Sequence, residues 1–186
     1  LVQDDKSRIW IGTNNGVACM DPSTGKIRRI SIGACSSTDP IDIYSLLSVN
    51  NQIWMATSCG IRVISTATFK EVKPGGLPAD IAAMQVNKLL LDKSRRIWFG
   101  TLENGVYLFD LKTKEVTNIF SSYDARYGLS NNSILSLFSS KAGEVWVGTW
   151  HGLNIYSDYS YKFPHFRNSG PQFLYSHNLI WSFTSL

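Results

Sequence analysis

The sequence predicts an all-β protein, specifically a segment of a β-propeller. A five-residue motif recurs at a nearly fixed period, with its tryptophan at positions 10, 54, 98 and 146, so the spacings are 44, 44 and 48 residues. Apolar residues alternate within short runs between polar turns, and no window shows the 3.6-residue periodicity of an amphipathic helix. A period of this length is typical of a repeat architecture built from four-stranded units.

The repeated motif is IWIGT at 9–13, IWMAT at 53–57, IWFGT at 97–101 and VWVGT at 145–149. Alternate side chains of a strand point to opposite faces, so each tryptophan shares a face with the small residue two positions later. We expect the small residue to leave room for a bulky side chain of an adjacent sheet. The eight structural positions of the repeat are Trp10, Gly12, Trp54, Ala56, Trp98, Gly100, Trp146 and Gly148.

Each motif leads through a short turn ending in glycine into a second alternating strand, which predicts a β-hairpin. An apolar strand is expected before the motif, at 43–49, 84–91 and 134–138. A weaker strand is expected after the hairpin, at 26–30, 69–72, 115–120 and 161–163. A parallel β-helix is the alternative architecture, but its shorter repeats would not need two tight hairpins.

The chain therefore divides into units at about 1–34, 41–73, 84–121 and 133–164, and a fifth unit begins at 175–186. Residues 1–4 resemble the end of a first strand, so we expect this sequence to be a segment of a longer protein. In one alternative, the last strand, near 179–183, pairs into the first unit, whose inner strand is short.

The pattern I/V-W-x-G/A-T-x-x-G resembles the two-component regulator propeller repeat, and the likeness extends over nearly the whole chain. Residues 128–134, GLSNNSI, also resemble that family's entry into the innermost strand. Ala56 departs from the glycine of the pattern, and the third unit has one extra turn residue. The resemblance implies about seven blades in the parent protein and an extracytoplasmic, periplasmic sensor of a hybrid two-component system. It also implies a glycan-derived ligand and a dimeric parent that signals to a histidine kinase outside this chain.

Composition limits the classes of partner. The net charge of +4 is scattered along the chain, which argues against nucleic acid, and no apolar run is long enough to span a membrane. We therefore expect membrane attachment only through segments of the parent that are missing here. The three cysteines allow at most one internal bridge and lack zinc-site spacing, and Cys19 is expected to be a small buried hydrophobic residue.

Catalytic motifs are not recognisable in the sequence. It lacks a phosphate-binding loop, a nucleophile elbow and a metal motif, and the three histidines are scattered without flanking carboxylates. Turn carboxylates such as Asp4, Asp92 and Glu144 are expected to cap their own backbone. We expect no cofactor, no metal and no enzyme activity in this segment.

Binding residues are expected on the loops, because a propeller presents loops at two faces. The candidates are Trp150 and His151 in the fourth hairpin turn, and Arg126 and Tyr127 in the long connection at 121–133. Planar aromatic and polar groups together would suit an oligosaccharide or another small ligand; packing between blades is the alternative role for them. The sequence predicts a ligand-sensing segment, and the alternatives are a protein-interaction propeller without a small ligand and a propeller lyase or hydrolase.

Overall fold

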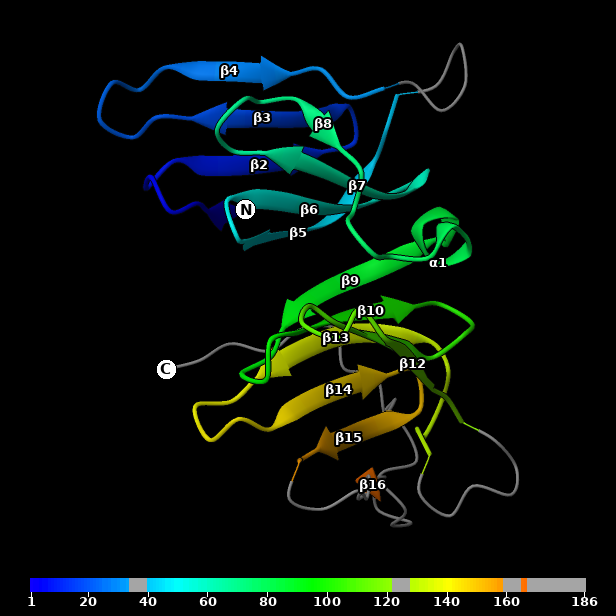
Figure 1. The fold of residues 1–186 in the computed structure, drawn as a ribbon. Helices are drawn as coiled ribbons and strands as arrows, with labels where there is room; N and C mark the ends of the chain where they lie inside the picture. Colours follow the sequence, from blue (N-terminus) through cyan, green and yellow to red (C-terminus); the bar gives the residue numbers. More distant parts are fainter. Residues whose placement is uncertain (34–39, 122–127, 159–164, 167–186) are drawn as a thin grey trace, which may run out of the picture. The chain divides into compact units, whose positions relative to one another are not determined.

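The computed structural model describes residues 1–33, 40–121, 128–158 and the backbone of 165–166, and it confirms the predicted fold class. Within these residues the chain forms four four-stranded antiparallel sheets of the kind that make propeller blades (Figure 1). In each sheet the strands follow one another in chain order. Each strand therefore pairs with its neighbour in sequence, as the predicted hairpins require.

The four sheets have these strands. The first contains β1 (Val2–Gln3), β2 (Ile9–Thr13), β3 (Gly16–Met20) and β4 (Ile27–Ile30). The second contains β5 (Ile43–Val49), β6 (Gln52–Thr57), β7 (Gly60–Ser65) and β8 (Glu71–Val72). The third contains β9 (Val86–Leu91), β10 (Arg96–Thr101), β11 (Val106–Asp110) and β12 (Val116–Ile119). The fourth contains β13 (Ile134–Ser139), β14 (Val145–Thr149), β15 (Gly152–Tyr156) and β16 (His165–Phe166).

The chain forms two compact units, residues 1–89 and 90–186. In the first unit, one face of the first sheet packs on the second sheet through a core of Trp10, Val17, Cys19, Ile30, Ile53, Met55 and Ile64. In the second unit, an equivalent core joins the third and fourth sheets and contains Trp98, Val106, Leu108, Leu129, Ile134, Val145 and Val147. Burial of these apolar side chains is the main stabilising contribution of each unit.

The expected pairing of a large and a small residue is observed at Gly12. A Cβ atom added to Gly12 would lie 2.6 Å from Cγ2 of Ile43 on β5. Glycine therefore allows a β-branched side chain of the next sheet to approach the strand that carries the tryptophan.

The threonine of the motif closes the hairpin turn, a role that the sequence analysis did not assign. The hydroxyl of Thr57 donates to the carbonyl of Gly60 over 2.7 Å and accepts the backbone N–H of Cys59 over 3.0 Å. The same pair of bonds recurs in the other three sheets. The glycine has a positive φ of 86° at Gly60, and a side chain there would meet the carbonyl oxygen of Ala82 at 2.4 Å.

Three local predictions differ from the structure. A short helix, α1 (Ala79–Ala83), lies between β8 and β9, although no window of the sequence shows a helical period; its five residues are too few to show one. Strands β8 and β9 begin at Glu71 and Val86, each two residues later than expected. The weak strand expected at 161–163 lies outside the described residues, and the outer strand of the fourth sheet is β16 at 165–166.

Candidate functional site

The fourth hairpin turn presents the predicted site residues Trp150 and His151 at the surface. The Trp150 side chain is 47% exposed, while its backbone N–H donates to the carbonyl of Ser133 over 3.0 Å. The backbone N–H of His151 donates to the hydroxyl of Thr149 over 3.2 Å. A further hydrogen bond of 3.3 Å joins Nδ2 of Asn131 and Nδ1 of His151. A fixed backbone thus carries an exposed indole beside an imidazole and an amide.

A buried polar cluster of Ser130, Thr149 and Asn154 holds this turn in place. Asn154 accepts the backbone N–H of Ser130 over 2.8 Å, and its Nδ2 donates to the Ser130 hydroxyl over 3.0 Å. That hydroxyl is also 2.9 Å from the hydroxyl of Thr149. All three residues are buried, and buried polar groups that satisfy one another fix a unique geometry. The segment before β13 is therefore locked to the hairpin that displays Trp150.

The same segment ties the third hairpin turn to the fourth. The carbonyl of Asn132 accepts the N–H of Gly105, and the hydroxyl of Ser133 donates to the carbonyl of Leu102. Since Ser133 also accepts the N–H of Trp150, the backbones of both turns are anchored on one residue. Leu102 is 46% exposed, so each of the two turns presents a large apolar side chain to solvent.

The structure tests only part of the predicted site. Arg126 and Tyr127 lie outside the described residues, so whether they join Trp150 and His151 stays a prediction. Asn131 and Leu102 were not singled out from the sequence. Asn131 could have been found from its place in the GLSNNSI segment, three residues before the first residue of the expected strand.

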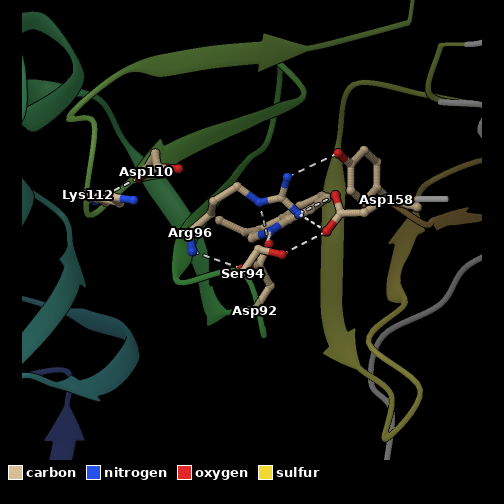
Figure 2. A network of polar contacts seen from close by, with 8 residues as sticks. Asp92, Ser94, Arg96, Asp110, Lys112 and Asp158 are labelled. Carbon is tan, nitrogen blue, oxygen red and sulfur yellow. Dashed lines mark hydrogen bonds and ion pairs between the residues drawn. The ribbon is translucent and has the colours of Figure 1, made fainter. Parts of the chain in front are cut away.

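A second polar network lies at the opposite ends of the strands and surrounds Arg96 (Figure 2). The buried Asp92 carboxylate accepts Nε of Arg96 over 2.7 Å and the indole N–H of Trp98 over 2.8 Å. Arg96 also bonds both carboxylate oxygens of Asp158, at 2.8 and 3.1 Å, and lies over the ring of Tyr156. Tyr156 is the last residue of β15 in the fourth sheet, and Asp158 lies two residues later. The network therefore links the third sheet to the fourth.

The first unit contains an equivalent network, in which an aspartate binds an arginine and a tryptophan. Asp4 accepts the indole N–H of Trp10 and Nε of Arg8, both over 2.8 Å. Arg8 also donates to the carbonyl of Thr66, which directly follows β7 of the second sheet. The Arg8 guanidinium lies over the ring of Phe69, which stacks on Trp10. The expectation that Asp4 and Asp92 cap their own backbones is confirmed, since Oδ1 of each accepts a backbone N–H. Their second oxygen has the additional role of holding the tryptophan and the arginine.

The pKa shifts of the charged residues in these two networks indicate that the residues have a structural role. Burial raises the pKa of Asp4 and of Asp158, but hydrogen bonds outweigh it and hold both pKa values below the usual range. Burial would lower the pKa of Arg96, but its bonds to the two aspartates raise it further above its ordinary value. Neither shift leaves a group poised to exchange protons near neutral pH, as a general acid or base would be.

The described residues offer neither a metal site nor a membrane-spanning helix. No group of histidine, cysteine or carboxylate side chains in the described ranges is arranged to hold a metal ion. Within these ranges, none of the helical structure is both long and apolar enough to span a membrane. Cys19 is free and buried, as expected, and burial raises the pKa of its thiol. Cys59 is in a disulfide bond, a feature that cysteine counting allowed without assigning.

Comparison with known proteins agrees with this architecture. Residues 128–151, which include the segment before β13 and the motif of β14, match the family model described as two component regulator propeller. This part of the chain therefore matches one two-component regulator propeller repeat.

Proteins with similar sequence or structure include a histidine kinase and extracellular domains of putative hybrid two component systems. A histidine kinase, P4, of Formosa agariphila is 29% identical over 118 residues, which are 61% of this chain and 9% of that protein. Two extracellular domains of putative hybrid two component systems from B. thetaiotaomicron each superpose with a TM-score of 0.71. Their identities are 25% and 23%, and the matches cover 88% and 89% of this chain but only 20% and 22% of theirs. This chain thus corresponds to a small part of each similar protein.

Proposed function

We propose that this chain is a non-catalytic, ligand-sensing segment of the propeller in an extracytoplasmic sensor of a hybrid two-component system. The repeat and the similarity to extracellular domains of such systems support this proposal. The parent would have about seven blades and would pass the signal, as a dimer, to a histidine kinase outside this chain. A ligand would act by binding one arrangement of that dimer more tightly than the other.

A periplasmic location is supported by the disulfide at Cys59. Disulfide bonds persist in oxidising compartments, including the bacterial periplasm, and are rare in the cytosol. The extracellular domains with similar structures agree with the same side of the membrane.

The ligand that we propose is a glycan-derived oligosaccharide, and the exposed Trp150 is the single observation that carries this proposal. An indole that is 47% exposed in a turn with a fixed backbone offers a flat apolar face to the C–H surface of a sugar ring. His151 and Asn131 lie beside it and can exchange hydrogen bonds with hydroxyl groups. Arg126 and Tyr127 would extend the same site.

A panel of oligosaccharides titrated by calorimetry tests the ligand proposal. We expect one class of oligosaccharide to bind without product formation, and Trp150→Ala to weaken that binding roughly tenfold or more, because a buried aromatic contact contributes a kilocalorie or more. Tyr44→Ala is the matched control, since Tyr44 is an aromatic residue of β5 that is 37% exposed and belongs to the first unit. Equal binding by Trp150→Ala and the unaltered protein would refute the assignment of the site.

The two other functions predict different outcomes. A protein-interaction propeller would bind none of the panel, and a lyase or hydrolase would release shorter products. The carboxylates Asp4 and Asp92, engaged with tryptophan and arginine, do not favour the catalytic alternative.

A further inference from the structure

The outer edge of β7 is only partly covered by its partner strand. Two residue pairs join β7 to β8, Val63 with Val72 and Ile64 with Glu71. Strand β7 begins three residues before Val63, so it extends beyond this pairing. Residues 60–62 therefore form an open edge of β7.

In the other three sheets the corresponding edge is closed. Ile61 pairs across its hairpin with Ala56, the small residue of the repeated motif. The residues that pair with the motif glycine in the other sheets also pair, on their other side, with a large apolar residue of the outer strand: Val17 with Ile30, Val106 with Ile119 and Leu153 with Phe166. The pair that closes three sheets is therefore missing from the second, whose strands are all described.

Pro74 explains why β8 ends early. Continuing the register of the two strands would place Pro74 opposite Ile61. Proline has no backbone N–H to donate to a neighbouring strand. Its carbonyl accepts the N–H of Leu77 over 3.2 Å, in a turn that leads the chain toward α1. The chain therefore leaves β7 at this point instead of completing the sheet.

The backbone of Ile61 faces the open side. The N–H of Ser65 donates to the carbonyl of Lys70, and the carbonyl of Ser65 accepts the N–H of Phe69, so Ser65 directs its backbone groups toward β8. Alternate residues of an antiparallel strand direct these groups to the same side, so Ile61 does likewise. Among the residues that the structure describes, neither group of Ile61 has a backbone partner there. Ile61 is buried, and buried backbone groups without a partner are costly, so the edge favours a ligand that supplies both a donor and an acceptor.

A groove of about 550 Å³ borders this open edge, a volume typical of ligand pockets. Its lining includes Ile61, Arg62, Pro74 and three alanines of α1, Ala79, Ala82 and Ala83. The alanines leave room beside the strand, because each side chain is a single methyl group. Arg62 is bonded to Glu71 over 2.7 Å, so the exposed Lys73 gives the lining one net positive charge. An acidic group on a ligand would complement that charge.

We propose that the open edge of β7 binds an extended peptide segment of a partner protein. One peptide residue would exchange two backbone hydrogen bonds with Ile61 and add to the sheet antiparallel to β7, as the outer strands of the other sheets do. Its side chain would be large and apolar, because Ile30, Ile119 and Phe166 occupy the corresponding position. The residue before it would meet Lys73 and would be acidic.

This site is independent of the proposed oligosaccharide site at Trp150, since its lining lies wholly within the first unit. The first and third sheets come before and after the second in the chain. Additional blades of the proposed parent would follow the fourth sheet or precede the first, so they would not supply the missing strand of the second sheet.

Amide hydrogen exchange of the 186-residue chain, followed by NMR, tests whether the edge is open. We expect the Ile61 amide to exchange at least about tenfold faster than the amides of Val17 and Val106, which the outer strands protect. An Ile61 amide as protected as those two would overturn the proposal.

The probe for binding is the peptide acetyl-Glu-Ile-Thr-Val-amide. We expect it to bind saturably and to slow the exchange of the Ile61 amide. Methylating the isoleucine N–H of the probe should weaken binding about tenfold, because it removes the backbone donor, and replacing this isoleucine by glycine should do the same by removing the apolar side chain. A probe that leaves the exchange of Ile61 unchanged at millimolar concentration, or a methylated probe that binds equally well, would overturn the proposal.

Variants of the groove test its location. Ala79→Phe and Ala83→Phe each place a ring on the groove wall at an exposed position, so the fold should persist while affinity for the probe falls about tenfold or more. Gln85→Phe adds the same ring at an exposed position that does not line the groove, and it should bind the probe like the unaltered protein. Equal affinity of all three variants would place the peptide elsewhere and overturn the proposal.

Discussion

Replacing Asp92 by alanine should destabilise the second unit far more than replacing Asp158, although both carboxylates bind the same arginine. The Asp92 side chain is 1% exposed and accepts Nε of Arg96, the backbone N–H of Arg96 and the indole N–H of Trp98. The Asp158 side chain is 43% exposed and accepts bonds from Arg96 and Ser94 near the surface (Figure 2).

The expected magnitudes follow from this difference in burial. Removing one partner of a buried ion pair costs about 3–5 kcal/mol, because the other charge and its donors remain without compensation. Removing one partner of a partly exposed pair costs about 1 kcal/mol or less, because water replaces it. For a chain of this size, 1 kcal/mol lowers the melting temperature by about 2–4 °C, so Asp92→Ala should lower it by roughly 10 °C and Asp158→Ala by less than about 4 °C.

Urea unfolding followed by circular dichroism, together with thermal melts, provides the assay. The ratio of the two effects is the decisive quantity, since both variants remove one negative charge. Similar destabilisation by Asp92→Ala and Asp158→Ala would refute the reasoning from burial, and so would an Asp92→Ala variant as stable as the unaltered protein.

Three further predictions concern other parts of the chain. Gly12→Ala should cost about 1–3 kcal/mol in urea unfolding, because its methyl group would meet Ile43 at 2.6 Å; an unchanged midpoint would contradict the pairing of large and small residues. The pKa of Asp4 is lowered in the folded state, so its contribution to stability is complete above the unfolded pKa of about 3.9 and is lost as the pH falls through the folded pKa. Acid should therefore shift the unfolding midpoint less in Asp4→Ala than in the unaltered protein, and equal shifts would exclude this role. Thiol titration of the unreduced, denatured chain should find one thiol, from Cys19, whereas three would show that the disulfide at Cys59 does not form.

The repeat made most of the fold predictable from the sequence. Four copies of one motif fixed the period, and the alternation of apolar residues placed strand β5 at its observed bounds, Ile43–Val49. Helix α1 could not be found in this way, because five residues provide little more than one turn of periodicity. The position of β16 also escaped prediction, since a two-residue edge strand has no apolar pattern of its own.

The polar networks were only partly predictable. Asp4 and Asp92 were recognised as turn residues, but their shared spacing of six residues from a tryptophan was not used. That spacing was the available signal, and it is obscured because the second repeat has Ser48 and the fourth has Ser140 at the equivalent position. The aromatic partners could not have been inferred, because Phe69 and Tyr156 come from different places in their sheets.

The candidate site was predictable as a turn that carries unusual side chains. An indole in a tight turn was conspicuous beside Asn14 and Ser58 at the corresponding positions, and the structure places Trp150 half in solvent. Its setting was not predictable, because the bond between Asn131 and His151 depends on two segments that are twenty residues apart in the sequence.

Reading the source gene on both sides of this segment tests the central claim most directly. The proposed sensor function predicts further units with the same tryptophan motif, followed by an apolar span of about 20 residues and a histidine-kinase region. A stop codon soon after the codon for Leu186, with no such region encoded, would contradict it and would favour a protein-interaction or enzymatic propeller.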